Sequence, residues 1–278
     1  MERVKISVLI SVYNPENSRQ LFQAVRSIIS QTFSDWEMIL YDDGSAKAYE
    51  PVIQKAAAMD SRIRYIRGKK NRGLAHALNA GLTLAKGEYI ARMDGDDISK
   101  PERFAREYEF LESHPEYQWV GSNTELIDAD GKWAVRKMPE IPEKRDFLNY
   151  SPYIHPSVMF RKEVLLEYRG YKESRRGEDY ELFMRLHAAG LRGYNLQENL
   201  FQYREDAVTY GHRKYRYQIE EVGIRFAGFR SLGLLNPKTL PYVLKPLATG
   251  LVPNRLLASV KKHVRKEMYV ERYKGSQT

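Results

Sequence analysis

Three carboxylates are crowded into residues 94–97, Asp-Gly-Asp-Asp, directly behind an apolar stretch at residues 89–91. Asp94 and Asp96 lie two positions apart, so both side chains can turn toward one hard cation, Mg²⁺ or Mn²⁺, while a ligand supplies further oxygens. An acidic turn that caps the next helix is the alternative, because Asp is common at caps. A calcium-binding EF-hand loop is excluded, because the position that would need a bidentate Glu is Ala105.

A second acidic pair, Asp42 and Asp43, ends another strand-like stretch at residues 36–41. Strand and helix patterns alternate from residue 4 to residue 97, which is typical of βαβ units in a mostly parallel sheet. Open sheets of this kind bind ligands in the crevice outside the carboxyl ends of their strands. The two acidic pairs are therefore expected to share one cleft.

The hydrophobic pattern predicts an α/β fold. Residues 4–12 are nearly all apolar and rich in β-branched side chains, which indicates a strand covered on both faces. Further strands are predicted at 36–41, 62–66, 88–92, 119–127, 158–160, 193–196 and 200–203, and helices through Leu21, Val25 and Ile28 and at 49–59, 73–85, 101–113, 162–168 and 180–189. We expect one domain at residues 1–210 and a helical C-terminal extension at 211–278.

Composition narrows the class of protein. The chain has no Cys, which excludes disulfides, thiol catalysis and Cys-based metal sites, and which fits a reducing cytosol. The N-terminal residues have neither the length nor the cleavage site of a secretory signal. The longest apolar stretch, residues 232–252, is interrupted by Pro and Lys, so it does not predict a transmembrane helix. We therefore expect a cytoplasmic protein.

Positive charge is concentrated at the C-terminal end. From Arg213 onward the chain has 14 Lys and Arg against 4 acids, a net charge of +10, whereas residues 1–212 have 31 against 32. Four basic residues at 261–266 follow apolar ones at 256–264, which predicts an amphipathic helix that lies on anionic lipid at the inner face of the membrane. Packing of that helix on the catalytic domain is the alternative. Charge confined to this tail argues against a nucleic-acid groove on the main domain.

The first strand lacks the glycine motifs of the common nucleotide-binding folds. Neither the Gly-x-Gly-x-x-Gly of a dinucleotide fold nor the Gly-x-x-x-x-Gly-Lys of a P-loop follows it. It runs instead into residues 11–15, Ser-Val-Tyr-Asn-Pro, which offer a hydroxyl group and an aromatic face for a planar base. Without a glycine cradle a diphosphate needs a cation, which Asp94 and Asp96 could hold.

Six short motifs together resemble the family 2 glycosyltransferases of the GT-A fold. They are residues 11–14 (Ser-Val-Tyr-Asn), 42–45 (Asp-Asp-Gly-Ser), 71–81 (Asn-Arg-Gly through Asn-Ala-Gly), 94–97, 155–157 (His-Pro-Ser) and 177–179 (Gly-Glu-Asp). The resemblance covers roughly residues 4–205 and follows the order of the family's motifs. It implies a mixed, mostly parallel central sheet flanked by helices.

The resemblance assigns the nucleotide of a UDP-type or TDP-type sugar donor to the ends of the first two strands. Asp43 would accept a hydrogen bond from the imide N–H of the base, and Asp42 would cap the next turn. Tyr13 would stack on the base, with Ser11 beside it. A buried aromatic residue at a strand end is the alternative for Tyr13.

The resemblance also assigns phosphate and metal contacts. Arg72 would reach the base or the phosphates, while Asn71 is either part of that contact or the N-cap of the following helix. Asp94 would touch the ribose or the metal, and Asp96 would bind Mn²⁺ or Mg²⁺ directly. For Asp97 we expect a cap of the helix that follows Pro101.

The implied reaction is transfer of a sugar to a hydroxyl group of a glycan or lipid-linked glycan, with inversion at the anomeric carbon, in cell-surface polysaccharide synthesis. The metal would neutralise the departing diphosphate while a carboxylate deprotonates the acceptor. The family places this base at Asp179, with Glu178 as the competing residue. An N-cap role is the alternative for Asp179, and a structural role is the alternative to an acceptor-side role for His155.

The chain departs from the family pattern in one motif, and two rival functions are considered. Residues 202–205 read Gln-Tyr-Arg-Glu and lack the Trp of processive, polymer-forming members, so we expect a single-addition transferase. A sugar-phosphate nucleotidylyltransferase would carry a Gly-rich, Arg-containing loop after the first strand, which this chain lacks. A nonenzymatic protein that binds nucleic acid or membrane through the basic tail is the other rival.

Overall fold

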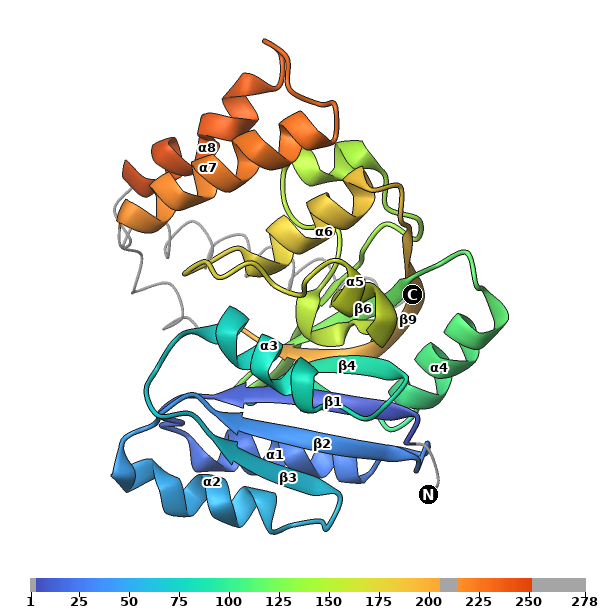
Figure 1. Cartoon of the computed structure of the whole chain (residues 1–278), viewed down its shortest axis with the longest axis vertical. Helices are drawn as coiled ribbons and strands as arrows, with labels where there is room; N and C mark the ends of the chain where they lie inside the picture. The colour runs from blue at the N-terminus through green and yellow to red at the C-terminus, as the bar shows by residue number, and fades with distance from the viewer. Residues whose placement is uncertain (1–3, 206–214, 252–278) are drawn as a thin grey trace, which may run out of the picture.

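A computed structural model describes residues 4–205 and 215–251 and shows a nine-stranded sheet with helices on both faces (Figure 1). The strand order is β3-β2-β1-β4-β8-β6-β9-β5, and β7 pairs with β6 outside that path. The strands are β1 (Ile6–Val12), β2 (Trp36–Asp42), β3 (Ile63–Arg67), β4 (Tyr89–Asp94), β5 (Ile98–Ser99), β6 (Trp119–Asp128), β7 (Gly131–Arg136), β8 (Met159–Arg161) and β9 (Gly193–Arg204). The helices are α1 (Ser18–Ile29), α2 (Glu50–Ala57), α3 (Leu74–Leu84), α4 (Arg103–Ser113), α5 (Lys162–Glu167), α6 (Glu178–Ala188), α7 (Tyr215–Ser231) and α8 (Leu240–Leu251).

The sheet is mixed and mostly parallel, as predicted. Strand β1 pairs in parallel with β2 and β4, and β2 pairs in parallel with β3. Strand β8 runs antiparallel to both of its neighbours, β4 and β6, and thereby joins this half of the sheet to the parallel pair of β6 and β9. The carboxyl ends of β1, β2 and β4 therefore meet at one edge.

Both faces of β1 are covered. Val8 and Ile10 pack in one core cluster with Leu21 of α1, whereas Leu9 packs in the other with Leu78 of α3. All three strand residues are almost completely buried. Burial on both faces explains why this strand is a near-continuous apolar run rather than an alternating one.

The cap role expected for Asp97 is wrong, and the cap alternative for Asn71 is not the one observed. Helix α3 is preceded by Gly73, whose φ of 93° favours glycine, so Asn71 is not its N-cap. Helix α4 begins after Glu102, and Asp97 instead accepts a hydrogen bond from the backbone N–H of Arg204 at 2.7 Å. In both cases the helix begins at a different residue, and the Asp97 side chain binds a distant segment instead.

Two features of the sheet also differ from the prediction. Strand β7 was not expected, because its six residues include only a few apolar side chains and its edge position buries few of them. The strands predicted at 193–196 and 200–203 are the single strand β9, whose pairing with β6 is irregular between Ser122 and Thr124. The irregularity lies where the apolar pattern is interrupted.

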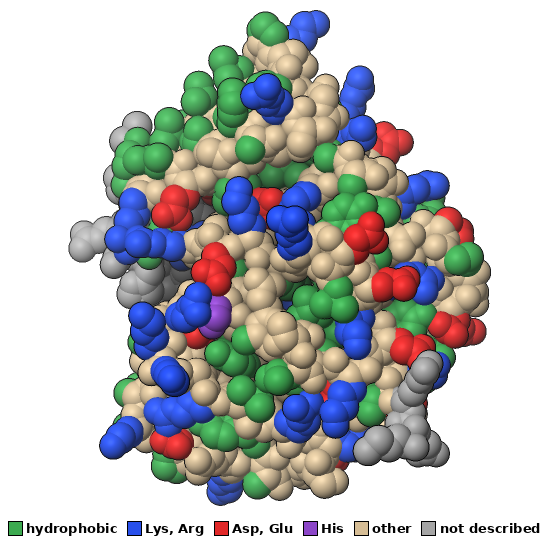
Figure 2. Space-filling view, in the orientation of Figure 1, with side chains coloured by type: hydrophobic (Ala, Val, Ile, Leu, Met, Phe, Trp, Pro, Cys, Tyr) green, Lys and Arg blue, Asp and Glu red, His purple; other side chains and the backbone are tan. Residues whose placement is uncertain are grey.

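Helices α7 and α8 pack against each other, and α7 packs on α6. Phe229 and Val243 belong to the same buried cluster as Phe183 of α6. Within the described ranges, no helix has the length and apolar character needed to cross a membrane. The predicted domain boundary and the basic cluster at 261–266 lie outside the described residues. On the visible face, apolar side chains gather over α8 at the upper left (Figure 2).

Candidate active site

The ends of β1 and β4 place Ser11 beside Asp94, because the two residues are register partners. Beyond β1 the chain turns at Asn14, whose φ is 45°. The Asn14 side chain accepts a hydrogen bond from the backbone of Ala46, which ties this turn to the loop after β2. Tyr13 is 52% exposed at this turn, so it is not a core residue and its ring is available to a ligand.

The two acidic residues at the end of β2, Asp42 and Asp43, have different roles. Asp42 is buried and accepts a hydrogen bond from the backbone N–H of Ser45 at 2.8 Å, so it caps the turn as predicted. Asp43 accepts from the backbone N–H groups of Arg72 at 3.1 Å and Gly73 at 2.7 Å. Burial raises the pKa of Asp43, although these two N–H groups oppose the shift. Asp43 is thus a fixed acceptor at the sheet edge.

Gly44 lies in the loop after β2, close to the backbone of the loop that precedes α3, and it cannot be replaced without strain. Its φ is 73°, and an added Cβ would lie 2.4 Å from the carbonyl carbon of Lys70. Glycine is therefore required by both the backbone conformation and the close approach of the two loops. The Asp-Asp-Gly-Ser motif is explained here by local geometry.

Asp94, Asp96 and Asp97 form an acidic cluster whose nearest ligand atoms all lie within 4.8 Å of one another. One carboxylate oxygen of Asp97, Oδ2, is buried and has no hydrogen-bond partner among the described residues. Loss of surrounding water, together with the charge of Asp94, raises the pKa of Asp96 to about 6. Three crowded carboxylates with a buried, unpaired oxygen fit a hard divalent cation.

Arg92 was missed in the sequence, although a lone charge in an apolar strand could have signalled it. The residue is 3% exposed in β4, and its Nη1 lies 2.6 Å from Asp94 Oδ2. Burial opposes its charge, but the carboxylate of Asp94 outweighs that effect and raises the pKa of Arg92. A buried cation therefore lies directly behind the acidic cluster.

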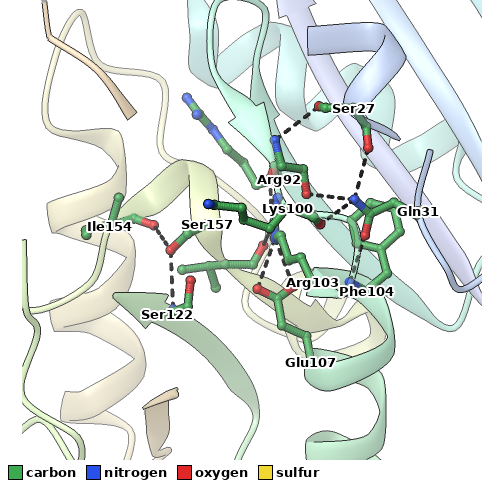
Figure 3. Close-up of polar contacts among 12 residues, drawn as sticks. Ser27, Gln31, Arg92, Lys100, Arg103, Phe104, Glu107, Ser122, Ile154 and Ser157 are labelled. Atoms are coloured by element: carbon green, nitrogen blue, oxygen red, sulfur yellow. Dashed lines mark hydrogen bonds and ion pairs between the residues drawn. The ribbon is translucent and has the colours of Figure 1, made fainter. Parts of the chain in front are cut away.

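A polar network fixes the backbone around this cation (Figure 3). The buried guanidinium of Arg103 donates to the Arg92 carbonyl at 3.1 Å and to the carboxylate of Glu107 at 3.0 Å. Gln31, which follows the C-cap of α1, donates to the Lys100 carbonyl at 2.7 Å and accepts from the Phe104 backbone. These contacts join the C-terminal end of α1 to α4, and α4 to β4, beneath the acidic cluster.

The last residue of β9, Arg204, also fixes the cluster. The Nε of Arg204 donates to the backbone carbonyl of Asp96 at 2.9 Å, and its backbone N–H donates to Asp97 Oδ1. The role of Arg204 was open in the sequence. Its contacts position the backbone of the acidic turn.

Helix α6 carries the second pair of carboxylates in its first turn. Gly177 precedes it in the left-handed conformation, φ 74°. Burial and the charge of Asp179 raise the pKa of Glu178 to about 7. Burial also raises the pKa of Asp179, against a hydrogen bond from the Tyr180 backbone. Both carboxyl groups are therefore stronger bases than ordinary acidic residues.

The two acidic regions line one cavity of about 670 Å³. Asp94 lies at the β4 side, and Glu178 and Asp179 lie at the start of α6. The wall also includes Pro156 of the His-Pro-Ser motif and residues that the sequence did not indicate: Arg92, Arg136, Lys137, Met138, Tyr150, Ser151, Tyr153, Ile154 and Tyr203. The end with Asp94 suits a cation, which can stabilise a departing anion. The end with Glu178 and Asp179 suits a proton acceptor, so the two steps can take place at opposite sides of one reacting group.

His155 lies in the wall of this cavity but is only 6% exposed. Its Nε2 lies 2.8 Å from the hydroxyl of Tyr171, which is also buried. Burial and the charge of Arg92 lower the pKa of His155 well below the usual value, so the ring is neutral. The pair shapes the wall next to the carboxylates.

Arg72 lies at a different cavity, of about 730 Å³, between the loop at 172–175 and helices α6 and α7. Its side chain forms an ion pair with Glu173, Nη2 to Oε1 3.3 Å, and is 47% exposed. The structure therefore brings together Asp94, Glu178, Asp179 and His155, and separately Arg72 and Asp43. Only the backbone of Arg72 contacts Asp43.

Comparisons with known sequences agree on one family. The sequence model of the family described as Glycosyl transferase family 2 matches residues 7–169. EpsE of Bacillus subtilis (strain 168), provisionally named a glycosyltransferase, is 38% identical over 253 residues that cover 90% of each chain. An Escherichia coli relative named UDP-Gal:alpha-D-GlcNAc-diphosphoundecaprenol beta-1,3-galactosyltransferase is 29% identical over 82% of this chain and 84% of its own.

Two solved structures share the fold. S. aureus TarS 1–349 in complex with UDP-GlcNAc matches with a TM-score of 0.66 at 17% identity, over 88% of this chain and 72% of that chain. The mannosyltransferase PcManGT from Pyrobaculum calidifontis, in complex with GDP-Man and Mn²⁺, matches with a TM-score of 0.59 at 16% identity, over 95% and 81% of the two chains. At these identities the likeness establishes the GT-A architecture.

Proposed function

Because the chain belongs to glycosyl transferase family 2 and is a glycosyltransferase, we propose that it moves a sugar from a UDP or TDP donor to a glycan hydroxyl group with inversion. The observation that carries this proposal is the shared cavity: Asp94 at the end of β4 and Asp179 at the start of α6 line the same space. A single addition in cell-surface polysaccharide synthesis is the biological setting we propose.

Asp179 is the proposed base, and Glu178 is its competitor. The acceptor oxygen attacks the anomeric carbon, the bond from that carbon to the diphosphate breaks, and the acceptor proton passes to the carboxylate. A base is most effective when its pKa is near the working pH, and burial has moved both carboxyl groups in that direction. Asp179 is preferred because the resemblance to the family places the base at this position, and as a residue it is less buried than Glu178.

Asp96 and Asp94 are the proposed ligands of a divalent cation, Mn²⁺ or Mg²⁺. Such a cation would act as a Lewis acid that neutralises charge on the departing diphosphate. Asp97 keeps the turn in place through Arg204 and contributes its unpaired Oδ2 to the same cluster. The presence of Mn²⁺ with PcManGT supports the class of ion, not its identity here.

The donor base is proposed to bind at the β1 and β2 ends. Asp43 is held by two backbone N–H groups, which leaves its carboxylate oriented as an acceptor for an imide N–H. Tyr13 presents an exposed ring for stacking, and Ser11 lies beside Asp94. Arg72 would have to leave its exposed ion pair with Glu173 to reach a phosphate, which costs little at such a site.

The acceptor is proposed to be a glycan or lipid-linked glycan that enters past His155. One relative acts by name on a sugar linked to diphosphoundecaprenol, which supports a lipid-linked acceptor. The wall near His155 also includes the exposed ring of Tyr150. The family match favours this transferase over the nucleotidylyltransferase and the nucleic-acid-binding protein considered above.

Thermal unfolding with UDP, TDP, GDP and CDP, each with and without Mn²⁺, tests the donor site. We expect UDP or TDP to raise the melting temperature only with Mn²⁺, because the acidic cluster needs the cation to hold a diphosphate. Asp130→Asn, an exposed acid in the β6–β7 turn, is the matched control for Asp96→Ala. The absence of any nucleotide effect with either metal would overturn the donor-site assignment.

Association with anionic membrane is proposed for the C-terminal helices. Tyr215, Ile219 and Phe226 are 45%, 57% and 46% exposed, and their spacing places them on one stripe of α7. Leu240 and Leu244 form a similar exposed pair on α8. Nine large apolar side chains are exposed in the described ranges, and five of them lie on α7 and α8. These two helices form only a small part of the described chain, so exposed apolar side chains are concentrated there.

The positive charges next to these apolar stripes favour binding to an anionic surface. Arg216 and Arg230 are exposed and flank the α7 stripe, whereas Glu221 pairs with Arg225 on the other side of the helix. The sequence after residue 251 adds seven Lys and Arg against two acids. Each basic residue near such a surface contributes about 1 kcal/mol.

Flotation of the full chain with phosphatidylglycerol vesicles tests this surface. We expect the double variant Ile219→Ser, Phe226→Ser to float less than the wild type, and zwitterionic vesicles to recruit neither. Ile141→Ser removes an equally exposed apolar side chain elsewhere and should float like the wild type. Equal flotation of the wild type, the double variant and a chain that ends near residue 250 would remove the proposal.

A further inference from the structure

Arg92 is fixed more firmly than the carboxylate that it contacts. Its backbone N–H donates to the Val158 carbonyl at 2.9 Å, and its carbonyl accepts from Arg103. The Arg92 side chain is 4% exposed, whereas that of Asp94 is 31% exposed. Movement within this ion pair is therefore available to Asp94 and not to Arg92.

Arg92 acts on every carboxylate of the cleft. Its charge favours the ionised forms of Asp96, Asp97, Glu178 and Asp179, and Asp94 is its ion-pair partner. Among the described residues, Arg204 also acts on Asp96. Counted as fully ionised, the three carboxylates together with Arg92 have a formal net charge of −2, which matches one divalent cation.

The contact between Arg92 and Asp94 is an ion pair rather than an aligned fork. The Nη1 atom lies 2.6 Å from Asp94 Oδ2, yet neither Nη1 nor Nε makes a hydrogen bond of good geometry to a described residue. Bidentate pairing is what allows arginine to orient a carboxylate. The pair therefore supplies charge rather than a fixed direction for the Asp94 side chain.

We propose that Arg92 is an internal counter-ion that neutralises Asp94 in the metal-free protein and competes with the divalent cation for it. The proposal rests on the metal site of the proposed function. Two cations that share one carboxylate repel each other, so the coupling between them is unfavourable. Arg92 thus keeps the acidic cleft folded before the donor arrives and weakens metal binding in the absence of the diphosphate.

Titration calorimetry with MnCl₂, without nucleotide, tests the competition in the full chain. We expect Arg92→Met to bind Mn²⁺ on the order of tenfold more tightly than the wild type, a usual size for coupling between two sites. Arg92→Lys keeps the charge and should bind like the wild type. Arg136→Met is the matched control, because Arg136 lines the same cavity but pairs with Glu205.

A second measurement separates this role from a structural one. Metal-free Arg92→Met should unfold at lower temperature than the wild type, and Mn²⁺ should restore more of its stability than it adds to the wild type. Loss of packing alone would lower stability without tightening metal binding. Arg92→Gln, a polar replacement, serves if the Met variant does not fold, with the same expected gain in affinity.

The outcomes distinguish the two proposals. If the wild type binds no Mn²⁺, the metal site of the proposed function fails. If the wild type binds Mn²⁺ but the Met and Gln variants bind equally or more weakly, Arg92 orients Asp94 and the counter-ion proposal is wrong. Tightening in Arg92→Lys equal to that in Arg92→Met would also overturn it, because the charge would then be irrelevant.

Discussion

Two cavities of nearly equal size open around α6, and they differ in how their charges are arranged. In the larger one, of about 730 Å³, charged residues are paired with one another: Arg72 with Glu173, Arg175 with Glu220, and Arg185 with Glu181. In the smaller one, of about 670 Å³, neither Glu178 nor Asp179 forms an ion pair with a described residue. Their carboxyl groups are held by the first turn of α6.

This difference distinguishes a surface of paired charges from the cavity that we propose as the active site. Exposed ion pairs contribute about 0 to 1 kcal/mol each and leave no group with unusual reactivity. Buried carboxylates without an ion-pair partner have raised pKa values and are available to a substrate. We therefore base the proposed site on the state of the charges and not on the size of the cavity.

The largest expected effect comes from Asp179→Asn in the smaller cavity. The variant should lower kcat by about 10² to 10⁴-fold, the usual contribution of a general base, and leave metal-dependent donor binding unchanged. Steady-state kinetics and donor-induced thermal shifts measure the two quantities. Glu173→Gln, the matched change in the larger cavity, should leave kcat within a few fold. Equal losses in both variants would contradict the contrast between the cavities.

Asp96→Ala should remove the cation-dependent part of donor binding. At 100 times its dissociation constant a ligand adds about 2.7 kcal/mol to the free energy of unfolding. In a chain of this size that corresponds to roughly 5 °C in the melting temperature. We expect this shift, measured with UDP and Mn²⁺ by scanning calorimetry, to disappear in the variant. A full shift would place the cation elsewhere.

Arg72→Gln sharpens the comparison, because it removes a charge from the larger cavity. If Arg72 binds a donor phosphate, the dissociation constant of UDP should rise about tenfold, or about 1.4 kcal/mol. The free energy of unfolding should change by less than about 1 kcal/mol, because the pair with Glu173 is exposed. Calorimetric titration and urea denaturation measure the two effects. Unchanged UDP affinity would leave Arg72 with a structural role only.

The smallest expected effect is a shift in the pH dependence of kcat. A carboxyl group with a raised pKa stays protonated to higher pH, so a reaction that needs the carboxylate slows as pH falls through that value. The pKa of Glu178 is raised to about 7, and that of Asp179 is also raised. Glu178→Gln removes a neighbouring negative charge, so the acid limb of the profile should move to lower pH. A move to higher pH would indicate that Glu178 does not repel the base.

Much of the fold could be predicted because local patterns carry it. The apolar run at β1 indicates burial on both faces of the strand. The helical spacing of Leu21, Val25 and Ile28 predicts the buried stripe of α1. The positions of Asp43 and Asp94 at strand ends follow from the same alternation of strands and helices. Parallel pairing then brings the ends of β1, β2 and β4 to one edge.

The errors arose where distant chain segments meet. Asp97 lies close to α4 in sequence, but its partner is the backbone of Arg204, more than 100 residues away. Asn71 precedes a helix, but the backbone of Gly73 begins it. Edge strand β7 buries too little apolar surface to leave a clear pattern. None of these contacts has a local signature that separates it from the common cap or turn.

By itself the sequence determined which residues are candidates for the chemistry and at which strand and helix ends they lie, because hydrophobic period and motif order are local properties. Only the tertiary structure decided how those residues are grouped. It joined Asp94 to Asp179 in one cavity, placed the Arg72 side chain in another, and set Arg92 behind the acidic cluster. Such groupings depend on the packing of segments far apart in the chain, and no periodicity encodes them.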